Sequence, residues 1–141
     1  MTPTNTFSEE YYTMPLNNTG KTDYVRFTGS RNLRHRLVCA TLTSRAVRID
    51  DIRAQGTSNP GLRAYEASLL RLLDKITNGS EIIINESGTS LKYKPGVIVG
   101  GKRLTHDCGL GRGLGYYVEA LCAIGIFGKK PMEITLSLIH I

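Results

Sequence analysis

The sequence predicts a mixed α/β (α+β) fold in which a βαβαββ unit is followed by an incomplete second unit of the same type. Segments with apolar residues three and four positions apart alternate with short runs of β-branched residues, which indicates helices between strands. A hairpin signal then closes the first unit. At 141 residues with 40% hydrophobic side chains, the chain can bury a core without disulfides or a structural metal. We therefore expect one domain, over residues 22–135.

The first strand and helix follow a lead-in, residues 1–21, which is rich in Thr, Asn and Ser and lacks periodicity, so we expect it to be disordered. Tyr24, Val25 and Phe27 predict a short strand. Gly29-Ser30 turns the chain, and Ser30 is the predicted N-cap of a helix that runs to about residue 43. The residues predicted to share the apolar face of this helix are Leu33, Leu37, Ala40 and Thr41.

The second strand and helix complete the first βαβα segment. Residues 47–52 are rich in β-branched side chains and predict a strand, and a polar loop follows at 54–60. Apolar residues then recur at helical spacing from Leu62 to Ile76, and Asn78-Gly79 is the predicted left-handed stop. The remaining predicted segments are a hairpin of strands 82–84 and 91–94 around the turn 86–89, a strand at 96–99, a helix at 114–127 and a strand at 132–136.

The charge balance favours an anionic partner. Eighteen basic residues against 12 acidic ones give a net charge of +6, and the arginines number 11 against 7 lysines. A guanidinium reads phosphate bidentately, so this composition leans toward nucleic acid or nucleotides, although net charge can also serve solubility alone. The longest apolar run, residues 120–127, is too short for a membrane helix, and residues 1–18 carry no targeting signal, so a cytosolic or nuclear location is expected.

The three cysteines, Cys39, Cys108 and Cys122, are widely spaced and odd in number. This pattern predicts reduced thiols rather than a disulfide framework, and without CxxC pairs it predicts no metal site. Cys39 and Cys122 lie in apolar helical stretches, where we expect them to be core residues.

Basic residues gather where the first helix should begin: Arg31, Arg34, His35 and Arg36. Cations oppose the positive end of the helix dipole, unless an anion or a carboxylate lies there. At helical spacing Arg31, Arg34 and His35 should project to one side and meet an anion bound by the free amides of the helix. The alternative is a solvated basic face with an acid nearby.

Three other motifs give weaker evidence of a functional site. Residues 96–102 spell GxxxxGK, but Arg103 stands where a P-loop needs Ser or Thr. The glycine-rich residues 109–115 predict a loop entering a helix, with Arg112 as a candidate phosphate contact. His106, Asp107 and Cys108 should alternate between the two faces of a strand, so they cannot converge on one substrate. The residues alone therefore predict no catalytic constellation and no cofactor.

Several strings together resemble the RNA 3'-terminal phosphate cyclase family, in its eukaryotic cyclase-like branch. These are RFTGSRNLRHRL at 26–37, DIR at 51–53, NPGL at 59–62, YKPGVIVGG at 93–101, HDC at 106–108 and GYYVE at 115–119. The resemblance implies a large domain of repeated βαβαββ-like units, of which residues 22–135 would be the first repeat and part of the second.

The resemblance also implies a dismantled nucleotide site. Where active cyclases carry a glutamate and a glutamine before the first helix, this sequence has Phe27 and Arg31, and a later glutamine corresponds to Glu119. Arg34 and Arg53 match arginines of the cyclase nucleotide site. No residue of this chain is therefore expected to be catalytic. The candidate RNA- or anion-binding residues are Arg31, Arg34, Arg36 and Arg53.

By this resemblance, the expected function is that of a ribosome biogenesis factor of the small-subunit processome, required for pre-rRNA processing toward 18S rRNA. It would be a non-cyclase RNA-binding or scaffold subunit in the nucleolus of the nucleus, linked to endonucleolytic cleavage in some accounts of the family. Its partners would be pre-rRNA and a ribosome-assembly GTPase, with no membrane. Two alternatives stay open: an active ATP-dependent RNA 3'-terminal phosphate cyclase, and a basic interaction module without RNA contact.

The last six residues, LSLIHI at 136–141, match the translation of a transposon-end adapter used in sequencing libraries. We expect them to be an artefact of a truncated gene model, and we exclude them from the fold prediction. An unfinished second unit should leave an unpaired strand edge and an uncovered apolar helix face.

Overall fold

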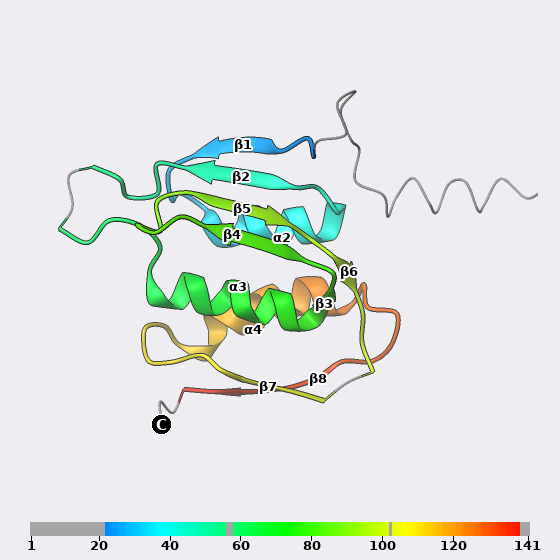
Figure 1. Ribbon diagram of the computed structural model, residues 1–141. Coiled ribbons are helices and arrows are strands. Elements are labelled where there is room, and N and C mark those ends of the chain that lie inside the picture. Colours follow the sequence, from blue (N-terminus) through cyan, green and yellow to red (C-terminus); the bar gives the residue numbers. More distant parts are fainter. Residues whose placement is uncertain (1–21, 56–57, 102, 139–141) are drawn as a thin grey trace, which may run out of the picture.

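The computed structural model describes residues 22–55, 58–101 and 103–138, and the predicted mixed α/β fold is confirmed (Figure 1). The elements in chain order are β1 (Val25–Thr28), α2 (Leu33–Thr43), β2 (Val47–Asp50), α3 (Ala64–Ile76), β3 (Thr77–Asn78), β4 (Glu81–Ile84), β5 (Leu91–Lys94), β6 (Val97–Ile98), β7 (Arg103–Asp107), α4 (Leu114–Gly125) and β8 (Glu133–Ser137). The lead-in predicted to be disordered, residues 1–21, lies outside the described residues, as do residues 139–141.

The predicted βαβαββ unit forms a four-stranded sheet in the order β1-β2-β5-β4. β1 and β2 pair in parallel, with Phe27 opposite Ile49, because α2 carries the chain back between them. β5 pairs antiparallel with both β2 and β4, and β4 and β5 are the predicted hairpin. β3 and β6 add a two-residue antiparallel ladder beside this sheet.

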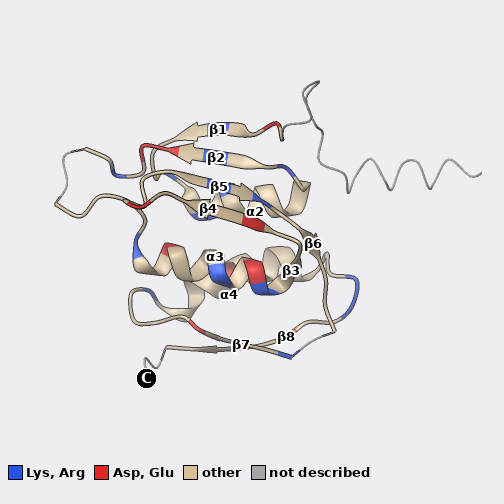
Figure 2. Cartoon of the chain, in the orientation of Figure 1, with Lys and Arg blue, Asp and Glu red and all other residues tan. Residues whose placement is uncertain are grey.

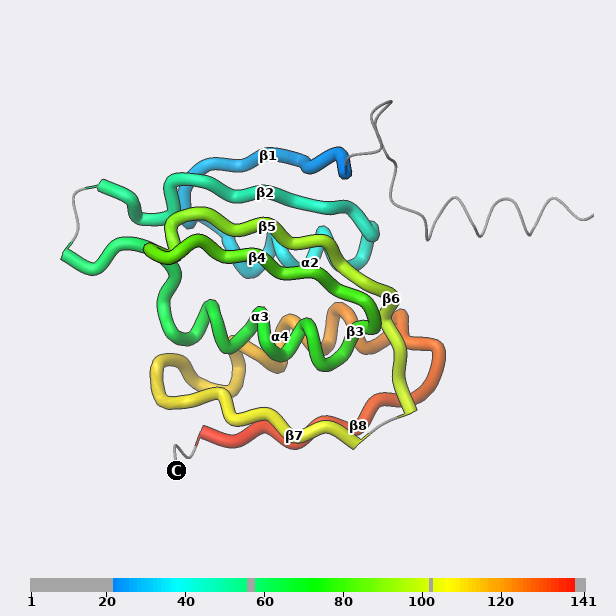
Figure 3. Tube along the Cα trace, in the orientation of Figure 1, coloured from blue at the N-terminus to red at the C-terminus, as the bar shows by residue number. Residues whose placement is uncertain are grey.

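The second unit contributes β7, α4 and β8. β7 and β8 pair in parallel, with His106 opposite Leu136, so α4 is a second crossover helix. Figures 1 and 3 show α3 and α4 between the four-stranded sheet and the β7–β8 pair, with α2 behind the sheet. The first repeat is thus followed by a βαβ segment that packs on the helices of the first.

The core lies where the helices meet the sheet. The largest side chains with less than 2% exposure include Leu37, Ile49, Leu69, Tyr93 and Tyr117. Buried polar groups are paired: the hydroxyls of Thr41 and Tyr93 lie 2.8 Å apart, and among the described residues no buried side-chain N or O atom lacks a hydrogen-bond partner. Such pairing avoids the cost of burying an unsatisfied polar group.

The start of α2 differs from the prediction. Ser30 is not the N-cap: the helix begins at Leu33, and the cap position is Asn32, in the left-handed region at φ 54° and without a side-chain cap bond. The Ser30 carbonyl instead accepts a hydrogen bond from the Leu33 N–H. The expected buried face, including Leu37 and Ala40, is confirmed.

The end of α3 also differs. The helix ends at Ile76, and Thr77 is extended at φ −115°, so Asn78-Gly79 is not the left-handed stop of this helix. Thr77 and Asn78 pair with β6, and Gly79, at φ +84°, turns the chain into β4. Glycine is also required at position 96, where a Cβ would lie 2.1 Å from the Asn78 carbonyl oxygen.

The prediction that Cys39 and Cys122 are core residues is wrong, because both are exposed, whereas Cys108 is buried. The buried face of α4 is formed by Tyr117, Ala120 and Ile124, and Cys122 lies outside that stripe. An apolar helix face is uncovered as expected: Val118 is 42% exposed, and Ile126, after α4, is 77% exposed.

Candidate anion-binding site

A cavity of about 270 Å³ opens at the N-terminus of α2, where the loop before α3 and the glycine-rich loop before α4 also arrive. We call it the arginine cavity because Arg34, Arg53 and Arg112 line it. Its other lining residues are Ser30, Asn32, Leu33, His35, Tyr65, Glu66 and Tyr116. The positive end of α2 thus faces three guanidinium groups, an arrangement that attracts anions.

Arg34 reaches from α2 to α4. Its Nη1 donates to the Tyr116 carbonyl oxygen at 3.2 Å, and its Nη2 lies 2.8 Å from Oε2 of Glu119. The guanidinium also lies over the Tyr116 ring, 4.8 Å from the centroid. Glu119 is 65% exposed, and a solvated pair of this kind is worth little, so a phosphate can compete for Arg34 at small cost.

Arg53 is held more firmly. Its guanidinium donates to both carboxylate oxygens of Glu66, at 2.5 and 3.2 Å, and this hydrogen bonding raises the pKa of Arg53. Glu66 is buried and also accepts the Arg63 N–H at 2.8 Å, which satisfies an unpaired donor at the start of α3. Arg53 therefore neutralises a buried carboxylate, and its charge is only partly available to a ligand.

Arg112 lies on an aromatic shelf formed by Tyr65 and Tyr116. Its guanidinium carbon is 4.7 Å from the Tyr65 ring centroid and 5.7 Å from that of Tyr116, and the two rings meet edge to face at 5.4 Å. Burial raises the pKa of Tyr116 to about 12, so this phenol remains a neutral hydrogen-bond donor at ordinary pH. Two aromatic rings and a guanidinium together form a surface that suits nucleotides.

The four candidate arginines do not all converge. Arg34 and Arg53 line the arginine cavity, together with His35, but Arg31 is exposed in the turn before α2 and does not line it. The prediction that Arg31 shares a helical face with Arg34 is wrong because the helix begins only at Leu33. Arg36 points elsewhere: it donates to the Gly29 carbonyl at 3.1 Å and covers the Phe27 ring at 4.7 Å.

Sequence reasoning identified Arg112 but missed the two tyrosines: Tyr65 was counted in the apolar spacing of the predicted helix from Leu62 to Ile76, and Tyr116 was noted only in the string GYYVE. The signal that could have found them is their place near the starts of α3 and α4, the two ends that face the first turn of α2. The nearby acids that the alternative, a solvated basic face, requires are present as Glu66 and Glu119. Three guanidiniums against two carboxylates leave the cavity positive.

The remaining candidate motif behaves as the strand pattern predicts. His106 and Cys108 are buried and Asp107 is exposed, so the three side chains alternate along the strand. Within residues 22–55, 58–101 and 103–138, no cluster of His, Cys, Asp and Glu has the makings of a metal site. None of the helices described is both long and apolar enough to cross a bilayer.

Comparison with known proteins defines the class. The model of the family described as RNA 3'-terminal phosphate cyclase matches residues 25–137, which include the arginine cavity. The chain belongs to the RNA 3'-terminal phosphate cyclase family.

Curated relatives are named either as cyclase-like proteins or for rRNA processing. The chain is 55% identical over 113 residues to the probable RNA 3'-terminal phosphate cyclase-like protein of Dictyostelium discoideum, covering 80% of this chain and 30% of the relative. It is 54% identical over 110 residues to the RNA 3'-terminal phosphate cyclase-like protein of Mus musculus, covering 78% and 29%. It is also 46% identical over 111 residues to the rRNA processing protein RCL1 of Saccharomyces cerevisiae, covering 79% and 30%. The resemblance inferred from the motifs is confirmed, and the chain spans about 30% of the length of these relatives.

Proposed function

We propose that this chain contributes an RNA-binding surface to a factor in rRNA processing. The observation that carries the proposal is the convergence of Arg34, Arg53 and Arg112 with two tyrosines at the N-terminus of α2. Phosphate binds guanidiniums and free helix amides, and aromatic side chains accept bases irrespective of sequence. Two relatives are named as rRNA processing proteins, and this supports rRNA precursors as the RNA that is bound.

The proposal extends to the setting that the cyclase-like resemblance implies. The factor acts in the small-subunit processome on the path to 18S rRNA, in the nucleolus, together with a ribosome-assembly GTPase. Its role there is that of a scaffold or RNA-binding subunit, and any linked endonucleolytic step would use residues beyond those named above.

A working cyclase is the less favoured function. Phe27 stands where cyclases carry glutamate, and its ring packs under the Arg36 guanidinium rather than offering a carboxylate. Glu119, at the position of a cyclase glutamine, brings negative charge to Arg34. Incubation of the full-length protein with radiolabelled ATP separates the two functions, because an active cyclase must become covalently labelled and a scaffold stays unlabelled.

Fluorescence anisotropy with a labelled single-stranded RNA of about 12 nucleotides tests RNA binding at the arginine cavity. The affinity K is measured in a salt titration from about 50 to 200 mM, and the salt slope is the magnitude of the negative slope of log K against log salt. Arg34→Ala/Arg112→Ala should reduce the salt slope by about 1.4, since each phosphate contact to a single strand contributes about 0.7.

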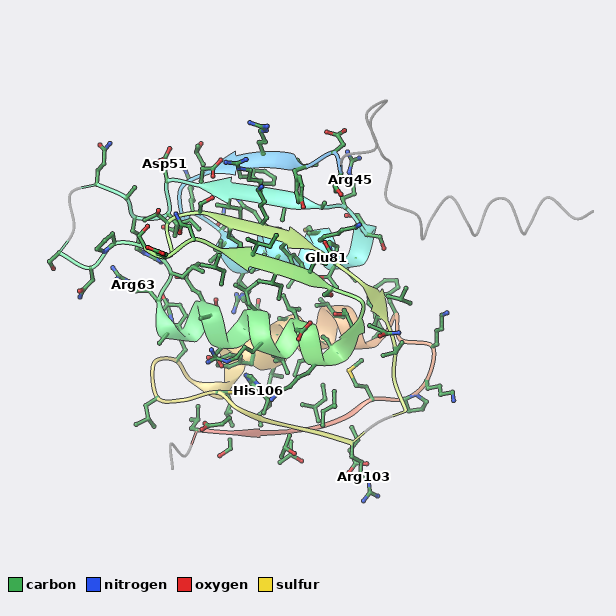
Figure 4. The ribbon with its side chains drawn as sticks, viewed as in Figure 1. Arg45, Asp51, Arg63, Glu81, Arg103 and His106 are labelled. Atoms are coloured by element: carbon green, nitrogen blue, oxygen red, sulfur yellow. The ribbon has the colours of Figure 1, made fainter. Side chains whose placement is uncertain are left out.

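The matched control is Arg45→Ala/Arg103→Ala, which removes the same charge from exposed positions. Figure 4 shows Arg45 beside the four-stranded sheet and Arg103 at β7, neither at the arginine cavity. A slope that stays at the wild-type value in the Arg34/Arg112 variant, or falls equally in the control, would overturn the proposal.

A further inference from the structure

A second groove runs along α3 and adjoins the arginine cavity at Tyr65. It has a volume of about 440 Å³ and lies between α3 and the segment that leaves β7. The α3 residues that line it form one stripe, in which Ser68, Arg71 and Lys75 follow the neighbouring pair Ala64 and Tyr65 at intervals of three or four positions. The facing wall is residues 106–111. We call this the α3 groove, and Tyr65 is common to both sites.

The two ends of the α3 groove differ in chemistry. Arg71 and Lys75 give one end two cations, whereas Tyr65 and the 79% exposed Leu110 make the other end apolar. The carboxylate among the lining residues, Asp107, accepts the Gly109 N–H at 2.9 Å and so is engaged by the loop. A ligand with a planar apolar part and an anionic part matches this division. Figure 2 shows basic positions on the α3 ribbon next to acidic ones.

The floor of the α3 groove fixes Lys75. His106 is a buried residue of β7 that contacts α3 (Figure 4), with Nε2 2.9 Å from the Ser68 hydroxyl and Nδ1 3.0 Å from the Lys75 ammonium. An ammonium group only donates, so Nδ1 accepts and Nε2 carries the proton that it donates to Ser68. Burial, and then the charge of Lys75, lower the pKa of His106, which keeps the ring neutral and able to accept.

This anchoring separates Lys75 from an ordinary surface lysine. Its ammonium donates to His106 and to the Thr105 carbonyl at 3.1 Å, and the third proton remains for a ligand. A lysine held in place loses less side-chain entropy on binding an anion than one that is free in solvent.

We propose that the α3 groove binds the nucleotide that follows or precedes the one at the arginine cavity on the same RNA strand. Its phosphate contacts Arg71 and Lys75, and its base lies against Tyr65 and Leu110. The shared wall at Tyr65 favours a continuous strand over a free mononucleotide, because one residue then borders two consecutive subsites. This inference rests on the proposed RNA binding at the arginine cavity.

The test uses the anisotropy titration with the same labelled single-stranded RNA and the variant Arg71→Ala/Lys75→Ala. We expect the salt slope to fall by about 1.4, and to fall by about 2.8 when these changes are combined with Arg34→Ala/Arg112→Ala. The charge-matched control remains Arg45→Ala/Arg103→Ala. Far-UV circular dichroism of each variant checks that exposed substitutions leave the fold intact.

A second readout locates the base. RNA carrying 5-iodouridine should cross-link on irradiation to the peptides that contain Tyr65 or Leu110, as identified by mass spectrometry, and much less so in Arg71→Ala/Lys75→Ala.

The outcomes are distinguishable. If Arg71→Ala/Lys75→Ala keeps the wild-type salt slope while the salt slope of Arg34→Ala/Arg112→Ala falls as expected, the α3 groove is not a subsite and the proposed function stands. A loss in Arg71→Ala/Lys75→Ala no larger than in the control also overturns the inference. If the wild-type chain shows no salt-dependent binding, both the proposed function and this inference fall.

Discussion

Replacing Arg53 by alanine should destabilise the fold by about 3 kcal/mol. The Glu66 side chain is only 4% exposed, and in the variant its carboxylate would keep one partner, the Arg63 N–H. Removing one member of a buried ion pair costs about 3 to 5 kcal/mol. Because the Arg53 side chain is 22% exposed, water can reach the vacated space, so the lower end of this range applies.

Urea unfolding followed by far-UV circular dichroism measures this loss, since the chain has no tryptophan to report by fluorescence. With an m-value of about 2 kcal/mol per molar urea, the midpoint should fall by about 1.5 M. The double variant Arg53→Ala/Glu66→Gln should be about 1 to 2 kcal/mol more stable than Arg53→Ala, because glutamine leaves no unpaired buried charge.

An exposed ion pair on the sheet provides a control for the stability cost of Arg53→Ala. Arg48 and Asp50 form a similar pair on β2, but each side chain is about one-third exposed, at 34% and 32%. Arg48→Ala should therefore cost less than about 1 kcal/mol. If Arg53→Ala costs no more than Arg48→Ala, and its effect simply adds to that of Glu66→Gln, then Glu66 does not depend on Arg53 and our account of the pair is refuted.

Two further predictions concern charge. Glu66→Gln should tighten RNA binding and raise the magnitude of the salt slope by up to about 0.7, because the charge of Arg53 is then uncompensated. The anisotropy titration measures this slope, and an unchanged slope would contradict the prediction. Since the pKa of His106 is lowered in the fold, the unfolded chain binds its proton more tightly. Stability should therefore decline as pH falls below about 6.5 and level off below the folded pKa. Urea midpoints from pH 5 to 8 should show less of this decline in His106→Gln.

Elements that depend on periodicity were predictable. The apolar spacing from Leu62 to Ile76 identifies α3, and the hairpin of β4 and β5 follows from turn residues between two apolar runs. In each case many side chains contribute to one signal, so a single atypical residue does not change the result.

Element ends depend on one or two residues, and there the prediction failed. Ser30 has the chemistry of an N-cap, yet Asn32 holds that position in a left-handed conformation. Gly79 has the chemistry of a helix stop, yet pairing of Thr77 with Ile98 ends α3 earlier. Both outcomes are decided by partners distant in sequence, which local preferences do not contain.

The candidate site was only partly predictable, because its contacts also depend on residues distant in sequence. Arg34 was found from the basic residues at the start of the predicted first helix, Arg53 through the resemblance, and Arg112 through its glycine-rich loop. The contacts that decide what each arginine can do, with Glu66, Glu119 and the tyrosines, join different elements and required the tertiary structure.

The mixed pairing of β2 has a consequence during synthesis. β1, α2 and β2 leave the ribosome as a unit that can pair at once, but β5 emerges only after α3 and β4. Until then, the β2 edge that will pair with Leu91–Lys94 is an open template for other chains. Arg48 and Asp50 place charges along that strand, which discourages aggregation while the nascent chain waits for its own hairpin.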